Sequence, residues 1–213
     1  MIAADAATLG ALSASPDAPL RGGVVVIQEI FGLSAHISEV CDRFAAAGYE
    51  ALAPSLFDRI EPDFCADMSP EGIQKGLAAV NATSWDQVAG DIQASIDALP
   101  KPCYITGFCY GGTAAWLAAA RCTGLSAASC FYGRLIADLL HEQPEVPLML
   151  HYGARDASIP PANIERVRAA APLSPLYLYD AGHGFCREGS HDFDAPARDL
   201  AFARTLDWFA RWR

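Results

Sequence analysis

Gly107-Phe108-Cys109-Tyr110-Gly111-Gly112 joins an apolar run, 103–106, to a helix-like run, 113–121. A strand, a sharp turn and a helix around G-x-C-x-G form the pattern of a nucleophile elbow, with cysteine in the usual place of serine. Gly107 and Gly111 let the two backbones pass closely, because neither carries a side chain. Cys109 would then stand at the tip of the turn, near the positive end of the helix, which favours a thiolate. The alternative is a buried structural cysteine in a glycine-rich turn.

Strand-like and helix-like segments alternate along the rest of the chain. We expect strands at 24–27, 49–53, 103–106, 125–132, 147–152 and 176–179, with a short edge strand from Thr8 to Ser13. We expect helices at 36–47, 70–81, 84–99, 113–121, 161–171 and 195–211. In the last of these, Leu200, Ala203, Leu206 and Phe209 form the predicted apolar face. The alternation predicts a single α/β domain over residues 1–213, with a mostly parallel central sheet and helices on both faces.

Four reactive side chains follow the ends of predicted strands. Glu29 and Cys109 come just past two of them, Asp156 follows the strand that ends at Tyr152, and His183 follows the strand that ends at Tyr179. In parallel sheets the ligand site lies beyond the carboxyl ends of the strands, so these residues are the candidates for one site.

Cys109, Asp156 and His183 occur in the order nucleophile, acid, histidine, which is the chain order of α/β-hydrolases. A histidine can deprotonate a thiol, and a carboxylate on its other nitrogen sets the tautomer. Taken singly, Asp156 could cap a turn and His183 could be an ordinary loop histidine. The four remaining histidines compete with His183 less well, because His151 lies within a strand and the others look like helix-end or loop residues: His36, His141 and His191.

Glu29 is the unusual member of this group. The segment 28–32, Gln-Glu-Ile-Phe-Gly, places a carboxylate at the end of a central strand. If Glu29 faces Cys109 it should oppose a thiolate, since like charges disfavour each other, or it could accept the thiol proton. An exposed loop acid is the alternative. The backbone N–H groups of Ile30 and Tyr110 are the candidate oxyanion hole.

Composition and charge narrow the class of protein. Hydrophobic residues make up 52% of the 213-residue chain, and the formal net charge is −10 without a basic run, which argues against nucleic acid or membrane partners. The seven cysteines form no C-x-x-C pair, so no metal site is indicated and we expect no cofactor. Unpaired cysteines in apolar segments favour a reducing compartment, and with no basic residue before Arg21 to suggest a signal peptide we expect a cytoplasmic protein.

The chain resembles the dienelactone hydrolase (carboxymethylenebutenolidase) family at segments 28–32, 107–112, 153–156 and 182–187. The resemblance extends from about Leu9 to Trp212. It implies a mostly monomeric α/β-hydrolase with a Cys–His–Asp triad that opens enol-lactone rings in chloroaromatic degradation. It also implies that Glu29 holds the resting thiol and takes part in its activation when substrate binds.

The resemblance implies further substrate contacts. Family members grip the substrate carboxylate with two arginines, one of which falls on Arg187. The other would come from the helical region before the elbow, where this chain has no arginine between Arg59 and Arg121 and offers only Lys75. An ammonium can pair with a carboxylate but cannot form a bidentate fork, so the binding of dienelactone itself is in question. Phe131 stands where a family tyrosine occurs, and Trp85 is a candidate for the pocket wall or for the core.

These observations predict a cysteine-dependent hydrolase of small, anionic enol-lactones or related carboxylic esters, acting through a thioester. A broad-specificity esterase is the nearer alternative. A non-catalytic redox or ligand-sensing domain with a reactive thiol is the more distant one, and an intact set of Cys109, His183 and Asp156 argues against it, because a sensor does not need the acid.

Overall fold

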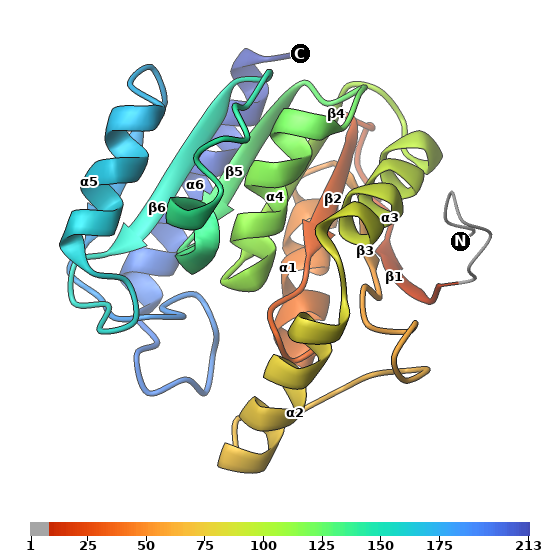
Figure 1. Cartoon of the computed structure of the whole chain (residues 1–213). Helices are drawn as coiled ribbons and strands as arrows, with labels where there is room; N and C mark the ends of the chain where they lie inside the picture. Colours follow the sequence, from red (N-terminus) through yellow and green to blue (C-terminus); the bar gives the residue numbers. More distant parts are fainter. Residues whose placement is uncertain (1–8) are drawn as a thin grey trace.

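The strand β2, Gly23–Ile27, lies inside a seven-stranded sheet with the order β1-β3-β2-β4-β5-β6-β7. The computed structural model describes residues 9–213 (Figure 1). All neighbouring strands are parallel except β1, which pairs antiparallel with β3 at one edge. The other strands are β1 (Ala11–Ala14), β3 (Glu50–Pro54), β4 (Cys103–Phe108), β5 (Ala127–Phe131), β6 (Leu148–Gly153) and β7 (Leu176–Tyr179). This is the mostly parallel sheet of the α/β-hydrolase fold that the alternation predicted.

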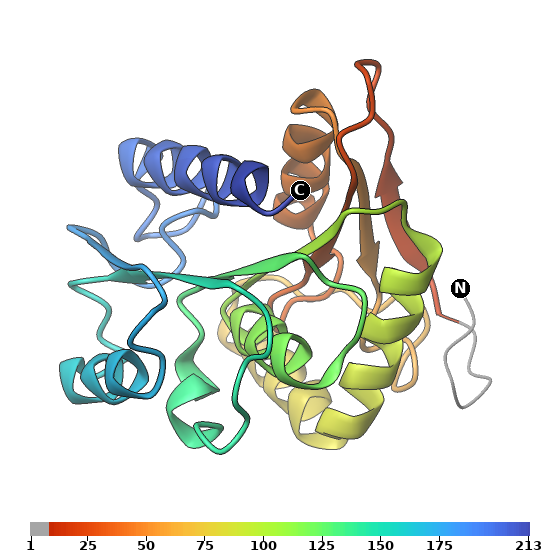
Figure 2. The ribbon, with the colours of Figure 1, turned by 90° about the horizontal axis from the view of Figure 1, so that it is seen from above.

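Helices cover both faces of the sheet. Figure 2 shows α1 (Ala35–Ala46) and α6 (Ala195–Arg211) on one face, and α3 (Trp85–Ala98), α4 (Tyr110–Arg121) and α5 (Pro161–Ala170) on the other. The helix α2 (Pro70–Ala82) projects beyond the end of the sheet in Figure 1. The capping box predicted at the start of α3 is present, because the Ser84 and Gln87 side chains each accept a hydrogen bond from the other residue's backbone N–H.

Several predicted boundaries need correction. Thr8 lies outside the described residues, and β1 begins at Ala11. The helix α4 begins at Tyr110, directly after Cys109, because the two glycines that follow are compatible with a helix packed tightly on the sheet. The predicted apolar face of α6 is partly wrong: Phe209 is buried, but Leu200 is 48% exposed and Thr205 takes a buried place. A short 3-10 helix, Arg134–Asp138, was not predicted.

The buried polar residue His151 explains the presence of Thr205 in the core. His151 lies within β6, and its ring nitrogens are hydrogen-bonded to the Tyr179 hydroxyl at 2.8 Å and the Thr205 hydroxyl at 3.2 Å. Burial lowers the pKa of His151 to about 3, so the ring is neutral at physiological pH. The expectation that this histidine belongs to the core is confirmed.

Candidate active site

The elbow has the strained backbone that its sequence predicts. Cys109 has φ 54° and ψ −113°, between the end of β4 and the first residue of α4. A Cβ atom at Gly107 would lie 2.0 Å from the Gly111 carbonyl oxygen, and one at Gly111 would lie 2.4 Å from the carbonyl oxygen of Ile27. Side chains at either position are therefore excluded. This close packing holds Cys109 in its strained conformation.

Cys109, His183 and Asp156 lie in a continuous hydrogen-bonded line. His183 Nε2 is 3.1 Å from Cys109 Sγ, and His183 Nδ1 is 2.6 Å from Asp156 Oδ2. The sulfur is partly buried, His183 keeps 25% of its side-chain surface exposed, and Asp156 is buried. Three loops that leave three different strands thus bring these side chains together.

The charges in this line favour a protonated imidazole. Burial by itself lowers the pKa of His183, but hydrogen bonds to Asp156 and Cys109 outweigh it and raise the pKa to about 10. Burial opposes ionisation of Asp156, yet hydrogen bonds from His183 and Ser158 hold the pKa of this carboxyl below its usual value. The raised pKa favours the cationic ring, which donates from both nitrogens, one toward the carboxylate and one toward the sulfur.

Ser158 is a member of this group that the sequence reasoning missed. Its backbone N–H and its hydroxyl both donate to Asp156 Oδ1, at 2.8 and 2.6 Å, and the hydroxyl lies 3.0 Å from His183 Nδ1. An aspartate whose side chain accepts from the residue two positions later is a common turn arrangement. The D-x-S spacing was therefore a usable signal.

Glu29 is paired with Arg187. Arg187 donates to Glu29 Oε2 at 2.7 Å, and the two side chains keep only 15% and 1% of their surface exposed. The guanidinium also lies over the Phe31 ring, 4.8 Å from its centroid. Arg187 was expected to bind a substrate anion, and any such anion would have to share this guanidinium with Glu29.

The carboxyl end of β2 packs directly against the elbow. Gly111 packs against the carbonyl oxygens of Ile27 and Gln28. Ile30 follows these two residues in the chain, so it lies at the same edge of the sheet as Tyr110. The Gln28 side chain fixes this end of the strand, since its amide oxygen accepts from the Leu56 N–H at 3.0 Å. The N–H of Tyr110 is in the first turn of α4, where backbone donors have no partner inside the helix. Both candidate oxyanion donors are thus held at one end of the sheet.

The two aromatic residues predicted to contact substrate lie in different environments. The Trp85 ring is partly buried and stacks on the Tyr110 ring, with centroids 5.3 Å apart. Phe131 is 2% exposed and stacks between Phe108 and His151, so it has no free surface for a substrate and the expectation for it is wrong. The ring that meets His183 belongs to the next residue, Tyr132, at 5.1 Å and with a left-handed φ of 36°.

Lys75, the candidate second carboxylate-binding cation, has its own partners in the structure. Its ammonium donates to Glu61 Oε1 at 2.9 Å and to the Cys65 carbonyl at 3.3 Å, and it lies over the Phe64 ring. These contacts fasten α2 to the loop that follows β3, and none of them involves Cys109, His183 or Arg187. Lys75 does lie on the helix before the elbow, as predicted. The acid that pairs with it, Glu61, lies fourteen residues earlier in the chain.

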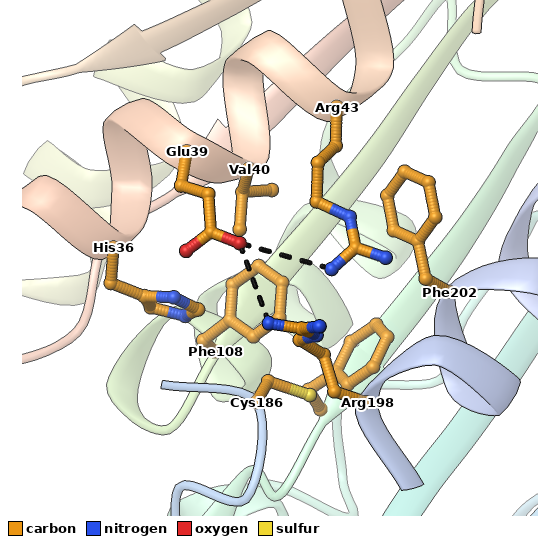
Figure 3. A pocket seen from close by; sticks show the side chains of 9 residues that line it. His36, Glu39, Val40, Arg43, Phe108, Cys186, Arg198 and Phe202 are labelled. Atoms are coloured by element: carbon orange, nitrogen blue, oxygen red, sulfur yellow. Dashed lines mark ion pairs between the residues drawn. The ribbon is translucent and has the colours of Figure 1, made fainter. Parts of the chain in front are cut away.

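A small pocket lies between α1 and α6, behind the elbow (Figure 3). Phe108 and Cys186 line it, and His36 stands over Phe108 with ring centroids 5.0 Å apart. Glu39 pairs with Arg43 at 3.8 Å and with Arg198 at 3.6 Å. The space inside is about 10 Å³, enough for about one water molecule. It is too small for an organic substrate.

Residues 9–213 contain neither a metal-binding cluster nor a membrane-spanning helix. Over that range, no three or more His, Cys, Asp or Glu side chains are grouped so that they could hold a metal ion. None of the helices in the described part of the chain is long and apolar enough to cross a membrane.

Comparisons with known proteins show which family this chain resembles. The model of the Dienelactone hydrolase family matches residues 9–212. A Pseudomonas putida protein named carboxymethylenebutenolidase is 32% identical over 220 residues, which cover 97% of this chain and 92% of that protein. A Salmonella typhimurium protein provisionally given the same name is 36% identical over 214 residues, 89% of this chain and 77% of that protein.

Solved structures extend the comparison. A crystal structure from Klebsiella pneumoniae, provisionally named a dienelactone hydrolase, has a TM-score of 0.83 and 31% identity, over 96% of this chain and 93% of that one. A metagenomic phosphotriesterase described as dienelactone hydrolase-like has a TM-score of 0.75 over 97% of this chain and 99% of its own, at 21% identity, which bears on the fold alone.

Proposed function

Because the chain belongs to the dienelactone hydrolase family, we propose that it is a cysteine-dependent hydrolase of enol-lactones or related carboxylic esters. The observation that carries the proposal is the line from Cys109 Sγ through His183 to Asp156, with contacts of 3.1 and 2.6 Å. A protonated imidazole that donates to the sulfur is the arrangement that holds a thiolate ready for attack.

The first half of the reaction forms a thioester. The Cys109 thiolate attacks the ester carbonyl carbon, and the N–H groups of Ile30 and Tyr110 receive the negative charge that develops on the carbonyl oxygen. The carbon–oxygen bond to the leaving group then breaks. His183 Nε2 gives its proton to the departing oxygen and becomes neutral, so the alcohol of an ester leaves as a neutral molecule, whereas the enol of an opened lactone stays attached to the acyl chain.

The second half releases the acid. Neutral His183 takes a proton from a water molecule, and the resulting hydroxide attacks the thioester carbonyl. The carbon–sulfur bond breaks, which restores the Cys109 thiolate beside the protonated His183. Asp156 keeps the ring oriented through both steps, and Ser158 in turn orients the Asp156 carboxylate.

Glu29 has a controlling role in this proposal. A free carboxylate near the sulfur would oppose the thiolate, whereas a carboxylate neutralised by Arg187 does so much less. Separation of Glu29 from Arg187 would leave the carboxylate charge uncompensated and so disfavour the thiolate.

Hydrolysis of 4-nitrophenyl acetate and of dienelactone by wild type and Cys109→Ala tests the function. We expect turnover that is lost in the variant, and a wild-type acyl-enzyme adduct on the Cys109 peptide in mass spectrometry after acid quenching. Unchanged turnover in Cys109→Ala would refute the proposal. Reversible oxidation of Cys109 by peroxide, with no turnover of any ester, would favour the sensing alternative.

A further inference from the structure

The helix α2 lies over the carboxyl end of β2, beside the elbow. Its buried side consists of small residues, and Gly76 sits so close to the Ile30 carbonyl oxygen that a Cβ atom would lie 2.4 Å from it. Ile30 is one of the two candidate oxyanion donors. The exposed side chains of α2 are therefore neighbours of the place where an ester carbonyl would bind.

The two flanks of α2 differ in chemistry. Lys75 marks the flank that is fastened to Glu61 and to the loop that follows β3. At 3.6 residues per turn, Ile73 and Leu77 lie roughly 160° around the helix from Lys75. They are 39% and 41% exposed, so an apolar stripe is left on the other flank.

The order of the strands shows which way that stripe faces. In the sheet β2 lies between β3 and β4. The loop after β3 thus starts on one side of the end of β2, and the elbow after β4 lies on the other. The Lys75 flank contacts the β3 loop, so the Ile73 and Leu77 flank is turned away from that contact.

Two further residues continue this surface toward Cys109. Val80 is partly buried one turn further along α2, and Trp85 stacks on the ring of Tyr110, the residue that follows Cys109. Ile73, Leu77, Val80 and Trp85 together are called the apolar flank below.

The cations around the apolar flank are already neutralised. Arg187 is bound to Glu29 at 2.7 Å, and Lys75 is bound to Glu61 at 2.9 Å. Arg59, in the loop before α2, is paired with the buried Asp91 at 2.5 Å. A substrate carboxylate would have to share one of these cations with a protein carboxylate, whereas an apolar group would cover side chains that water now contacts.

We propose that the apolar flank binds an apolar substituent of the substrate, so that this enzyme prefers neutral esters with a hydrocarbon chain to anionic lactones or esters. The inference rests on the proposed function, because it assigns the substrate class of the same site. Covering about half of each methylene predicts a gain of about twofold in kcat/KM per added carbon, or about 16-fold from acetate to hexanoate.

The experiment measures kcat/KM for 4-nitrophenyl acetate, pentanoate, hexanoate and hydrogen succinate. We expect hexanoate to exceed acetate by about tenfold or more. We also expect pentanoate to exceed the anionic succinate, which is of similar length. A hexanoate-to-acetate ratio near one, or succinate hydrolysed faster than pentanoate, would overturn the inference.

Variants test whether the apolar flank is the cause. Ile73→Ser and Leu77→Ser should each lower the hexanoate-to-acetate ratio by about twofold to fourfold. Leu200→Ser is the matched control, because Leu200 is 48% exposed on α6, across the sheet, and this variant should keep the wild-type ratio. Leu77→Arg should shift preference toward succinate. Unchanged ratios in all three α2 variants would refute the assignment.

The failure of this inference can be told apart from the failure of the proposed function. If acetate turnover is lost in Cys109→Ala while chain length has no effect, the thioester mechanism stands and the apolar flank does not bind substrate. If Cys109→Ala keeps its acetate turnover, the mechanism itself is refuted.

Discussion

Replacing Glu29 by glutamine should destabilise the protein far more than its single lost charge would on the surface. Glu29 keeps 1% of its side-chain surface exposed, and its partner Arg187 keeps 15%. Glutamine has nearly the same shape and an amide oxygen that can still accept from Arg187. The change therefore removes the charge and little else.

The expected loss follows from the charge that stays behind. Removing one partner of a buried ion pair costs about 3–5 kcal/mol, because the other ion remains buried without compensation. We expect the lower end, about 3 kcal/mol, since the partly exposed guanidinium can reach water and the amide keeps one hydrogen bond. For a chain of this size that corresponds to a fall of about 6–12 °C in Tm.

Urea unfolding followed by circular dichroism measures the loss. Glu61→Gln is the matched control, because it removes a carboxylate from the exposed Lys75 pair, with side chains 53% and 40% exposed, and should cost less than about 1 kcal/mol. The double variant Glu29→Gln/Arg187→Met should recover part of the loss. A cost below about 1 kcal/mol for Glu29→Gln, or a double variant as unstable as the sum of the singles, would contradict the reasoning.

Three other predictions concern the same region. Asp156→Asn should fold but lose about 10⁴-fold in kcat on activated esters, because the imidazole loses its orienting acceptor; a loss below about tenfold would refute this. Since the pKa of His183 is raised to about 10, the protonated ring stabilises the folded protein. This contribution to the free energy of unfolding is complete below pH about 6.5 and is lost as the pH rises through 10. The free energy of unfolding that separates wild type from His183→Gln, measured in urea, should thus shrink between pH 6.5 and 10, and a constant difference would contradict it. Gly107→Ala should cost more than about 3 kcal/mol, because its methyl would meet the Gly111 carbonyl, whereas Gly90→Ala, with no atom within 4 Å, should gain about 0.5–1 kcal/mol. Equal thermal unfolding of these two variants would refute the packing argument.

Local sequence was sufficient for the framework. The β-branched run 24–27 and the other apolar runs predicted the strands, and Ser84 with Gln87 predicted the start of α3, because propensities and caps act within a few residues. The elbow could also be read locally, since its strand, glycines and helix are contiguous. The order of Cys109, Asp156 and His183, combined with the rule on strand ends, brought the right three side chains together.

Contacts between distant segments could not be read in this way. Arg187 and Glu29 are 158 positions apart, and nothing in either neighbourhood indicates that they form a pair. The same applies to Lys75, whose charge suggested a substrate contact until the loop after β3 supplied Glu61. Phe131 faces the core, whereas Tyr132 contacts His183. The alternation along β5 could not predict this difference, because the positive φ of Tyr132 ends the strand pattern at that residue.

The sequence by itself therefore determined the fold, the position of Cys109 at the elbow, and the two side chains, His183 and Asp156, that lie in line with it. The reason is that hydrophobic periodicity and turn chemistry are local and repeat along the chain. Only the tertiary structure decided which charges are free, because ion pairing depends on distances between segments that the sheet order brings together. Whether this site offers a substrate a cation or an apolar surface therefore depends on the tertiary structure.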